Sequence, residues 1–172
     1  VLAWQSVTDA LVVAGADRDG RGDLAVLDLG GGTGADAVRL AGLGHRVVVV
    51  DPSPDALAAS ATRAAEAKVT VQGILGDATD LAEHVDLASF DLVICHGVLE
   101  YVADPAQALE SARSVLRQGG WLSITVASRV AAVAARVAAG DIAGARALVN
   151  AVPDASWDSA SAKLVRCTSS IS

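Results

Sequence analysis

The sequence predicts an α/β fold with a doubly wound, mainly parallel sheet, for three reasons. Five short apolar segments alternate with helical patterns along the chain, at 24–29, 45–50, 69–75, 90–95 and 121–127. The segments 45–50 and 90–95 carry nearly continuous apolar runs, as central parallel strands covered on both faces do. A glycine-rich turn at 30–34 leads from the first apolar segment straight into a helical pattern. Strands that alternate with helices form right-handed crossovers, and these build a parallel sheet.

Composition predicts one globular unit. The chain has 172 residues, of which 52% are hydrophobic but only 3% aromatic, so Ala, Val and Leu must build the core. The regular pattern weakens after residue 127, and we expect one domain over 1–150 followed by an irregular tail over 151–172. A short strand at 163–168 is the one element expected in that tail. The C-terminal strands of the sheet are therefore expected to be incomplete.

Local signals place the helices between these strands. Ser53 and Pro54 are a helix cap and a first-turn proline, Asp104 and Pro105 repeat that pair, and Gly44 ends the helix before the second strand. The expected helices cover 1–14, 34–43, 54–68, a short polar piece at 81–85, a helix from 105 to the Gly119-Gly120 pair, and 131–149.

Charge and residue usage exclude several classes of protein. The net charge of −7 argues against a broad basic surface for nucleic acid, so any RNA contact must be local or come from segments absent here. No apolar run approaches the ~20 residues of a membrane span, and we expect a soluble cytoplasmic protein without membrane contact. Cys95 ends an apolar strand and Cys167 lies in the polar tail, so no disulfide is expected. Histidines occur singly, which predicts no metal site.

Acidic residues follow the predicted strands at the edge where parallel sheets bind ligands. Asp28 stands two positions before Gly30, where nicotinamide-binding strands usually carry an apolar residue. Asp51 ends the second strand, and a carboxylate there can accept hydrogen bonds from both hydroxyls of a ribose. A glycine loop without any ligand is the structural alternative.

Asp77 follows the third strand in the segment Gly-Asp-Ala-Thr-Asp. An ordinary turn or helix-capping role is one interpretation. In the other, the carboxylate accepts from an adenine amine and the backbone N–H of Ala78 faces a ring nitrogen. Ribose and adenine contacts on adjacent strand ends would describe a bound adenosine.

This pattern resembles the class I S-adenosylmethionine-dependent methyltransferases, whose fold is Rossmann-like, over about residues 24–127. The resemblance implies S-adenosyl-L-methionine as cofactor and S-adenosyl-L-homocysteine as product. A nicotinamide-dependent oxidoreductase is the competing interpretation, but the sequence has no Tyr-x-x-x-Lys or similar hydride-transfer pair. The cofactor-binding residues implied are Asp28, Gly30, Gly31, Gly32, Gly34, Asp51, Pro52, Asp77, Ala78 and His96.

A narrower resemblance lies in 96–105 (HGVLEYVADP), 114–120 (SVLRQGG) and 138–141 (AAGD). These segments are similar to the bacterial tRNA methyltransferases that esterify 5-carboxymethoxyuridine at the wobble position, with Tyr101 in place of Trp and Gln118 in place of Pro. The resemblance implies that His96 contacts the cofactor. His96 is also the nearest candidate base if the acceptor is a phenol or alcohol. We expect Glu100 and Tyr101, at the start of the next helix, on the substrate side or in capping and packing.

The resemblance does not cover the ends of the chain. Full-length relatives carry a segment before the first helix and an antiparallel pair of strands at the C-terminus, so this chain resembles a version truncated at both ends. Three functions therefore remain open: a tRNA methyltransferase, a methyltransferase acting on a small carboxylate, phenol or alcohol, and a non-catalytic cofactor-binding fragment. Sheet edges left exposed by missing strands would favour a homodimer.

Overall fold

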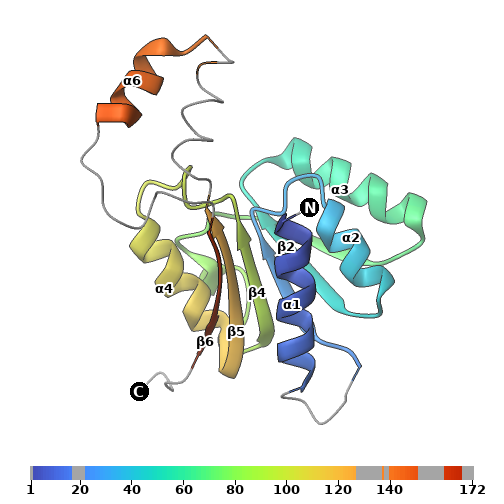
Figure 1. Ribbon diagram of the computed structural model, residues 1–172. Helices are drawn as coiled ribbons and strands as arrows, with labels where there is room; N and C mark the ends of the chain where they lie inside the picture. The colour runs from blue at the N-terminus through green and yellow to red at the C-terminus, as the bar shows by residue number, and fades with distance from the viewer. Residues whose placement is uncertain (1, 17–21, 127–136, 138–139, 151–160, 168–172) are drawn as a thin grey trace.

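The computed structural model describes residues 2–16, 22–126, 137, 140–150 and 161–167. Within them lies a six-stranded sheet in the order β3-β2-β1-β4-β5-β6, parallel except for β6, which runs antiparallel to β5 (Figure 1). The sequence prediction of a doubly wound, mainly parallel sheet is confirmed. The strands are β1 Ala25–Leu29, β2 Arg46–Asp51, β3 Val71–Leu75, β4 Phe90–His96, β5 Leu116–Val126 and β6 Ser161–Arg166.

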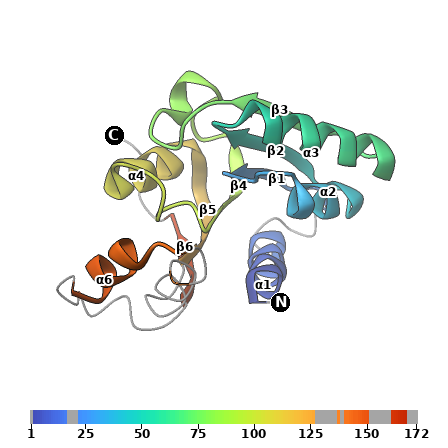
Figure 2. The ribbon, with the colours of Figure 1, turned by 90° about the horizontal axis from the view of Figure 1, so that it is seen from above.

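Helices cover both faces of this sheet. Helices α1, α2 and α3 lie on one face, and α4 lies on the other beside the short helix η1 (Figure 2). Helix α6 stands apart from the sheet (Figure 1). The described helices are α1 Leu2–Ala16, α2 Ala35–Gly42, α3 Pro54–Ala67, η1 Leu81–Glu83, α4 Pro105–Val115 and α6 Ile142–Asn150.

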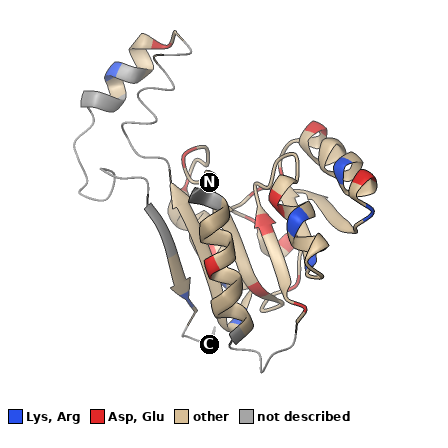
Figure 3. Ribbon diagram, turned by 45° about the vertical axis from the view of Figure 1, so that its right-hand side comes forward, with Lys and Arg blue, Asp and Glu red and all other residues tan. Residues whose placement is uncertain are grey.

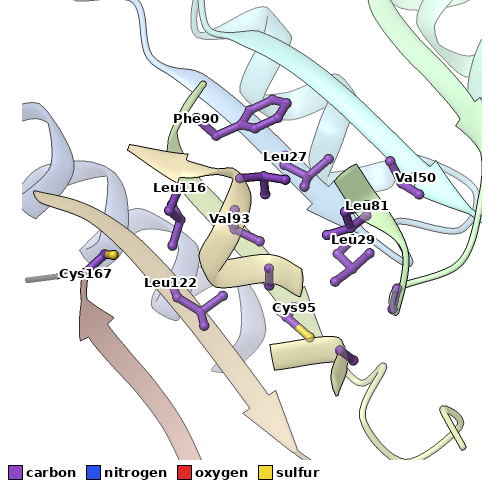
Figure 4. Packing of buried hydrophobic residues seen from close by; sticks show 14 of the residues in the cluster. Leu27, Leu29, Val50, Leu81, Phe90, Val93, Cys95, Leu116, Leu122 and Cys167 are labelled. Carbon is purple, nitrogen blue, oxygen red and sulfur yellow. The ribbon is translucent and has the colours of Figure 1, made fainter. Parts of the chain in front are cut away.

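Alternate residues of the central strands divide the core into two layers. Leu27, Val93 and Cys95 pack with α4 (Figure 4), whereas Val26 and Ile94 pack with α1 and α2. Because side chains alternate across a strand, a continuously apolar strand supplies both layers. The burial of all five residues of β1 follows from this arrangement. None of the described helices is both long and apolar enough to cross a membrane.

The predicted helix starts are confirmed. The side chain of Ser53 accepts a hydrogen bond from the N–H of Ala56, and Asp104 accepts from the N–H groups of Ala106 and Gln107. Each cap satisfies N–H groups that have no partner inside the helix. Gly44 follows the end of α2 with a φ of +93°, as expected of a glycine that terminates a helix.

The predicted end of α4 is wrong. The helix ends at Val115 rather than at Gly119-Gly120, and Leu116 already pairs with Phe90 of β4. The next strand pair joins Leu92 to Trp121, so residues 117–120 form a bulge in β5. Tertiary hydrogen bonds hold this bulge, because the N–H of Gly119 donates to the carbonyl of Cys167 and the N–H of Cys167 donates to the carbonyl of Gly120.

The C-terminal segment is more ordered than expected where it is described. A strand does occur there, but at Ser161–Arg166, and it covers the edge of β5. Cys167, expected in a polar tail, is buried against the α4 layer of the core, and both cysteines are free thiols. The sequence predicts a helix over 131–149. Val137 and residues 142–149 are helical, whereas residues 140 and 141 are not. The other positions of the predicted helix lie outside the described residues.

An ion pair with a buried carboxylate joins three strands at the amino end of the sheet. Asp91 is 4% exposed and accepts a hydrogen bond of 2.8 Å from the N–H of Ala25 at the start of β1. Its second oxygen lies 2.8 Å from the guanidinium of Arg117 in the β5 bulge, which also donates to the carbonyl of Ser89. One carboxylate thus links β1, β4 and the bulge.

Replacing Asp91 tests this link. Asp91→Ala leaves the N–H of Ala25 and the partly buried Arg117 guanidinium without the acceptor they share, and leaving donors unsatisfied in this way costs about 1–3 kcal/mol. We expect the free energy of unfolding, measured by urea denaturation, to fall by that amount. Asp86→Ala, at an exposed position before β4, is the control and should change it by less than about 0.5 kcal/mol. Equal effects would show that the pair contributes nothing specific.

Candidate functional site

The glycine turn lies at the carboxyl end of β1, beside the carboxyl ends of β2 and β4. Gly30, Gly32 and Gly34 have φ values of +63°, +54° and +73°, a region that other L-residues adopt only with strain. The N–H of Gly30 donates to the carbonyl of Val50 at 2.8 Å. The turn is therefore bonded to β2 where it leaves the sheet, and only glycine suits its alternate positions.

Neighbouring side chains pack directly onto the backbone of this turn. A Cβ added to Gly30 would stand 2.6 Å from a methyl of Val98, and one on Gly31 would stand 2.5 Å from Oδ2 of Asp28. At Gly34 the conflict is with Ser60 of α3, whose Oγ would be 2.1 Å away. These glycines allow β1, α3 and the segment after β4 to close around the turn.

Asp51 bonds the turn to the end of β2. Its Oδ2 accepts from the N–H of Gly32 at 2.9 Å, and its Oδ1 accepts from the N–H of Ser53 at 2.8 Å. The side chain is 7% exposed. The sequence predicted that Asp51 binds a ligand, and the structure adds that this carboxylate also shapes the glycine turn.

Asp28 lies beneath the turn and is 5% exposed. Burial, together with the smaller effect of the nearby acids Asp36 and Asp51, raises the pKa of its carboxyl to about 7. A carboxyl in this position titrates near neutrality rather than near its ordinary value of 3.8. The charge beneath the turn therefore depends on pH and on whatever binds above it.

Asp77, at the neighbouring end of β3, differs from Asp28 and Asp51 in being exposed. Its Oδ1 accepts from the N–H and the hydroxyl of Thr79 at 2.9 and 2.8 Å. These hydrogen bonds and a weaker one from the N–H of Ala78 lower the pKa of the Asp77 carboxyl. Asp77 thus has the ordinary turn role that is one interpretation of the sequence. It also lies next to buried Ala78 at the edge of the sheet where a ligand is predicted to bind.

His96 ends β4 on the same sheet face as Asp28. Its Nε2 lies 2.9 Å from Oγ of Ser123 in β5, and that hydroxyl lies 3.2 Å from Oγ of Ser6 in α1. The other ring nitrogen, Nδ1, is buried and has no hydrogen-bond partner among the described residues. Burial lowers the pKa of His96, with a smaller opposing effect from Asp36, so the imidazole is neutral at pH 7.

The two predicted substrate-side residues have different surroundings. Glu100 is half-buried and near enough to Cys95 to raise the pKa of that thiol, which burial chiefly raises to about 12. Tyr101 projects into solvent and is 88% exposed. Pro52, beside Asp51, is exposed as well. The structure therefore brings Asp28 and Asp51 to the turn and His96 to the neighbouring strand end, while Glu100 lies near Cys95 and both Tyr101 and Asp77 are exposed.

Two cavities of about 360 and 620 Å³ lie away from this site. Both are lined by Val48, Gln72, Ser89 and Phe90, of which Val48 and Phe90 belong to the core layer on the α4 face of the sheet. The candidate site is instead an open edge of the sheet. Among the described residues, no group of three His, Cys, Asp or Glu side chains could hold a metal ion.

Sequence reasoning missed the residues that support the site from behind. Ser123 interrupts the apolar run of β5, and that isolated polar residue was the available signal. Nothing in the sequence around Ser60 and Asp36 indicates a role in the site, because serine and aspartate are also common on exposed helix faces. Their roles depend on how α2 and α3 pack beside the turn.

A doubly wound sheet with a glycine turn after β1 and a carboxylate at the end of β2 is the arrangement of domains that bind nucleoside cofactors. Comparison with known families assigns the class of domain. The sequence model of the methyltransferase domain matches residues 27–124. The chain belongs to this methyltransferase domain family.

Individual relatives agree with that assignment. The tRNA 5-carboxymethoxyuridine methyltransferase of Escherichia coli K12 is 40% identical over 126 residues, which cover 72% of this chain and 46% of that protein. A ubiquinone biosynthesis O-methyltransferase of Paraburkholderia phymatum is 35% identical over 104 residues, covering 60% and 44%. The chain thus spans about half the length of the curated relatives that it matches.

A solved structure shares the fold and part of the sequence. The arsenic(III) S-adenosylmethionine methyltransferase of Chlamydomonas reinhardtii matches with a TM-score of 0.56 and 32% identity, over 61% of this chain and 39% of that one. The sequence prediction of a class I methyltransferase domain is confirmed.

Gly34→Ala tests the close packing of the turn. A φ of +73° and the contact with Ser60 both oppose a methyl group, so the free energy of unfolding should fall by at least about 1 kcal/mol. Gly42→Ala is the matched control, because its Cβ meets nothing within 4 Å at the end of α2. That variant should be neutral or stabilised by up to about 1 kcal/mol in urea denaturation. An unchanged Gly34→Ala protein would contradict the packing described.

The buried Asp28 carboxyl makes stability depend on pH. Between about pH 4 and 7 the folded protein holds a proton on Asp28 that the unfolded chain has lost. The free energy of unfolding should therefore fall as pH rises across this range, by up to about 1.4 kcal/mol per pH unit, and level off above it. Asp28→Asn should remove this contribution, seen as a flatter pH profile in denaturation experiments. Parallel profiles for both proteins would refute a raised pKa at Asp28.

Proposed function

We propose that this domain is an S-adenosylmethionine-dependent methyltransferase. The observation that carries the proposal is the hydrogen bond between Gly32 and Asp51, which unites the glycine turn and the acid of β2 into one wall at the carboxyl edge of the sheet. Membership of the methyltransferase domain family supports it.

The residues present fit this cofactor. Gly30 to Gly34 let a ligand lie against the backbone of the turn, and Asp51, with the ionised form of Asp28, supplies negative charge for a cationic ligand. Nδ1 of His96 is a buried polar atom that has no hydrogen-bond partner among the described residues. S-adenosylmethionine, when bound, supplies a methyl group already activated by a positively charged sulfur, so that the protein's main task is orientation.

Asp51 is proposed to bind the ribose. Each of its oxygens accepts one backbone N–H, and a carboxylate oxygen has a second lone pair for a hydroxyl donor. Asp77 and Ala78, on the neighbouring strand end, are proposed to contact the adenine. Pro52 and Gly31 would complete the nucleoside side of the site. Because the turn at Asp77 already holds its carboxylate in place, binding needs little reordering there.

The proposed acceptor is the carboxylate of 5-carboxymethoxyuridine in tRNA. The name of the Escherichia coli relative supports this choice, and a carboxylate is ionised at neutral pH and needs no general base. Basic residues are spread over several elements, including α2, α3 and α6 (Figure 3), so a tRNA would require further contacts beyond them.

A small-molecule O-methyltransferase is the second candidate, supported by the relatives named for ubiquinone biosynthesis. A phenol or alcohol acceptor must lose a proton, and neutral His96 at the end of β4 is available to accept it. Replacing His96 should then lower kcat more than cofactor affinity. Glu100 and Tyr101, on the side of the site away from Asp51, are the residues proposed to meet either acceptor.

Calorimetry with variants of Asp51 tests the cofactor. S-adenosylmethionine should bind the chain, NAD should not, and Asp51→Asn should weaken binding at least about tenfold, since it loses two charge-assisted hydrogen bonds and the ribose contact. Asp86→Asn removes a charge at an exposed position outside the site and should leave affinity unchanged. Binding of NAD alone would overturn the proposal.

Mass analysis of tRNA bearing 5-carboxymethoxyuridine, incubated with the protein and cofactor, then tests the acceptor. A methyl ester on that nucleoside is expected. Methylation of a phenol in place of tRNA would favour the second candidate. Tight cofactor binding without any transfer would identify the chain as a non-catalytic binding fragment.

A further inference from the structure

Ser123 is a polar residue in a position where the fold otherwise places apolar side chains. It is 0% exposed and lies between Leu122 and Ile124 in β5. Strand register aligns it with Ile94 of β4, which in turn aligns with Asp28 of β1. A buried hydroxyl without a hydrogen-bond partner costs free energy, so the contacts of Ser123 require an explanation.

Those contacts join three elements behind the candidate site. The hydroxyl of Ser123 lies 2.9 Å from Nε2 of His96 in β4 and 3.2 Å from the hydroxyl of Ser6 in α1. One proton lies between Ser123 and each neighbour, whichever atom donates. The imidazole of His96 is consequently held at Nε2 by a group that the rigid centre of the sheet positions.

The other ring nitrogen, Nδ1, makes no such hydrogen bond to the described residues. Nδ1 of His96 is buried and has no partner among the described residues, although His96 stands at the carboxyl end of β4 where the proposed cofactor binds. A ring held at Nε2 cannot turn by half a revolution without losing its bond to Ser123. The orientation that retains this bond leaves Nδ1 as the nitrogen available to a ligand.

We propose that Ser123 is a positioning residue: it holds His96 at Nε2 so that Nδ1 contacts the bound cofactor. This inference rests on the proposed function. Ser123 itself does not touch the ligand, and Ser6 bonds to the far side of its hydroxyl. The bond can form in either neutral tautomer of His96, because the hydroxyl of Ser123 can accept from Nε2 or donate to it.

Calorimetry on a cycle of variants tests the coupling. Ser123→Ala should weaken S-adenosylmethionine binding about three- to tenfold, the value of one hydrogen bond. In a His96→Ala background the same change should have no further effect, because the residue that Ser123 positions is gone. Ser6→Ala is the matched control: it also removes one hydroxyl and leaves the bond between Ser123 and His96, so affinity should stay within about twofold. Urea denaturation verifies that each variant is folded.

Nitrogen NMR of the histidine ring gives a readout that a merely structural serine would not move. Addition of S-adenosylhomocysteine should shift the Nδ1 resonance of His96 and leave Nε2 nearly unchanged in the wild-type protein. In Ser123→Ala both resonances should respond. A shift confined to Nε2, or equal losses from Ser123→Ala with and without His96, would overturn the role of Ser123. Failure of the wild-type protein to bind either nucleoside would instead refute the proposed function.

Discussion

The site depends on one hydrogen bond, from the N–H of Gly32 to the carboxylate of Asp51. The glycine turn leaves β1 and Asp51 ends β2, so this bond decides how two neighbouring strand ends face each other. A second bond, from Gly30 to the carbonyl of Val50, holds the start of the same turn. Together these bonds orient the turn toward the edge of the sheet, and the close contacts with Val98 and Ser60 leave it little room to change.

Charge is distributed unevenly within this edge. Asp28 is buried beneath the turn, and this burial, with a smaller effect from the nearby Asp36 and Asp51, raises the pKa of its carboxyl. An arrangement of this kind is unfavourable for an empty protein and becomes favourable when a cation binds above it. The buried Asp28 beneath the turn therefore agrees with a proposed ligand that carries a positive sulfur, and it stands where other nucleotide-binding strands have an apolar residue.

The other half of the edge is organised by β4 and β5. Register places Asp28, Ile94 and Ser123 in one row, with His96 two residues nearer the carboxyl end of β4. Support for His96 therefore comes from strand order, which sets β4 between β1 and β5. At the opposite end of the sheet, Asp91 accepts a hydrogen bond from Ala25 and pairs with Arg117, and these two interactions keep the same strands together. The same strands thus carry the stabilising ion pair at one end of the sheet and the proposed ligand-binding residues at the other.

Local patterns in the sequence determined the succession of strands and helices along the chain, the caps at Ser53 and Asp104, and the glycine turn with its acids, because each depends on residues close together in the chain. The end of α4 could not be predicted, since the bulge at 117–120 is held by Cys167 and Asp91 from distant segments. The burial of Cys167 and the strand at Ser161–Arg166 likewise require β5 as a partner. Only the tertiary structure decided that Ser123 bonds to His96 and that Asp36 lies near enough to Asp28 to raise the pKa of its carboxyl. Such contacts arise only when separate strands and helices pack together.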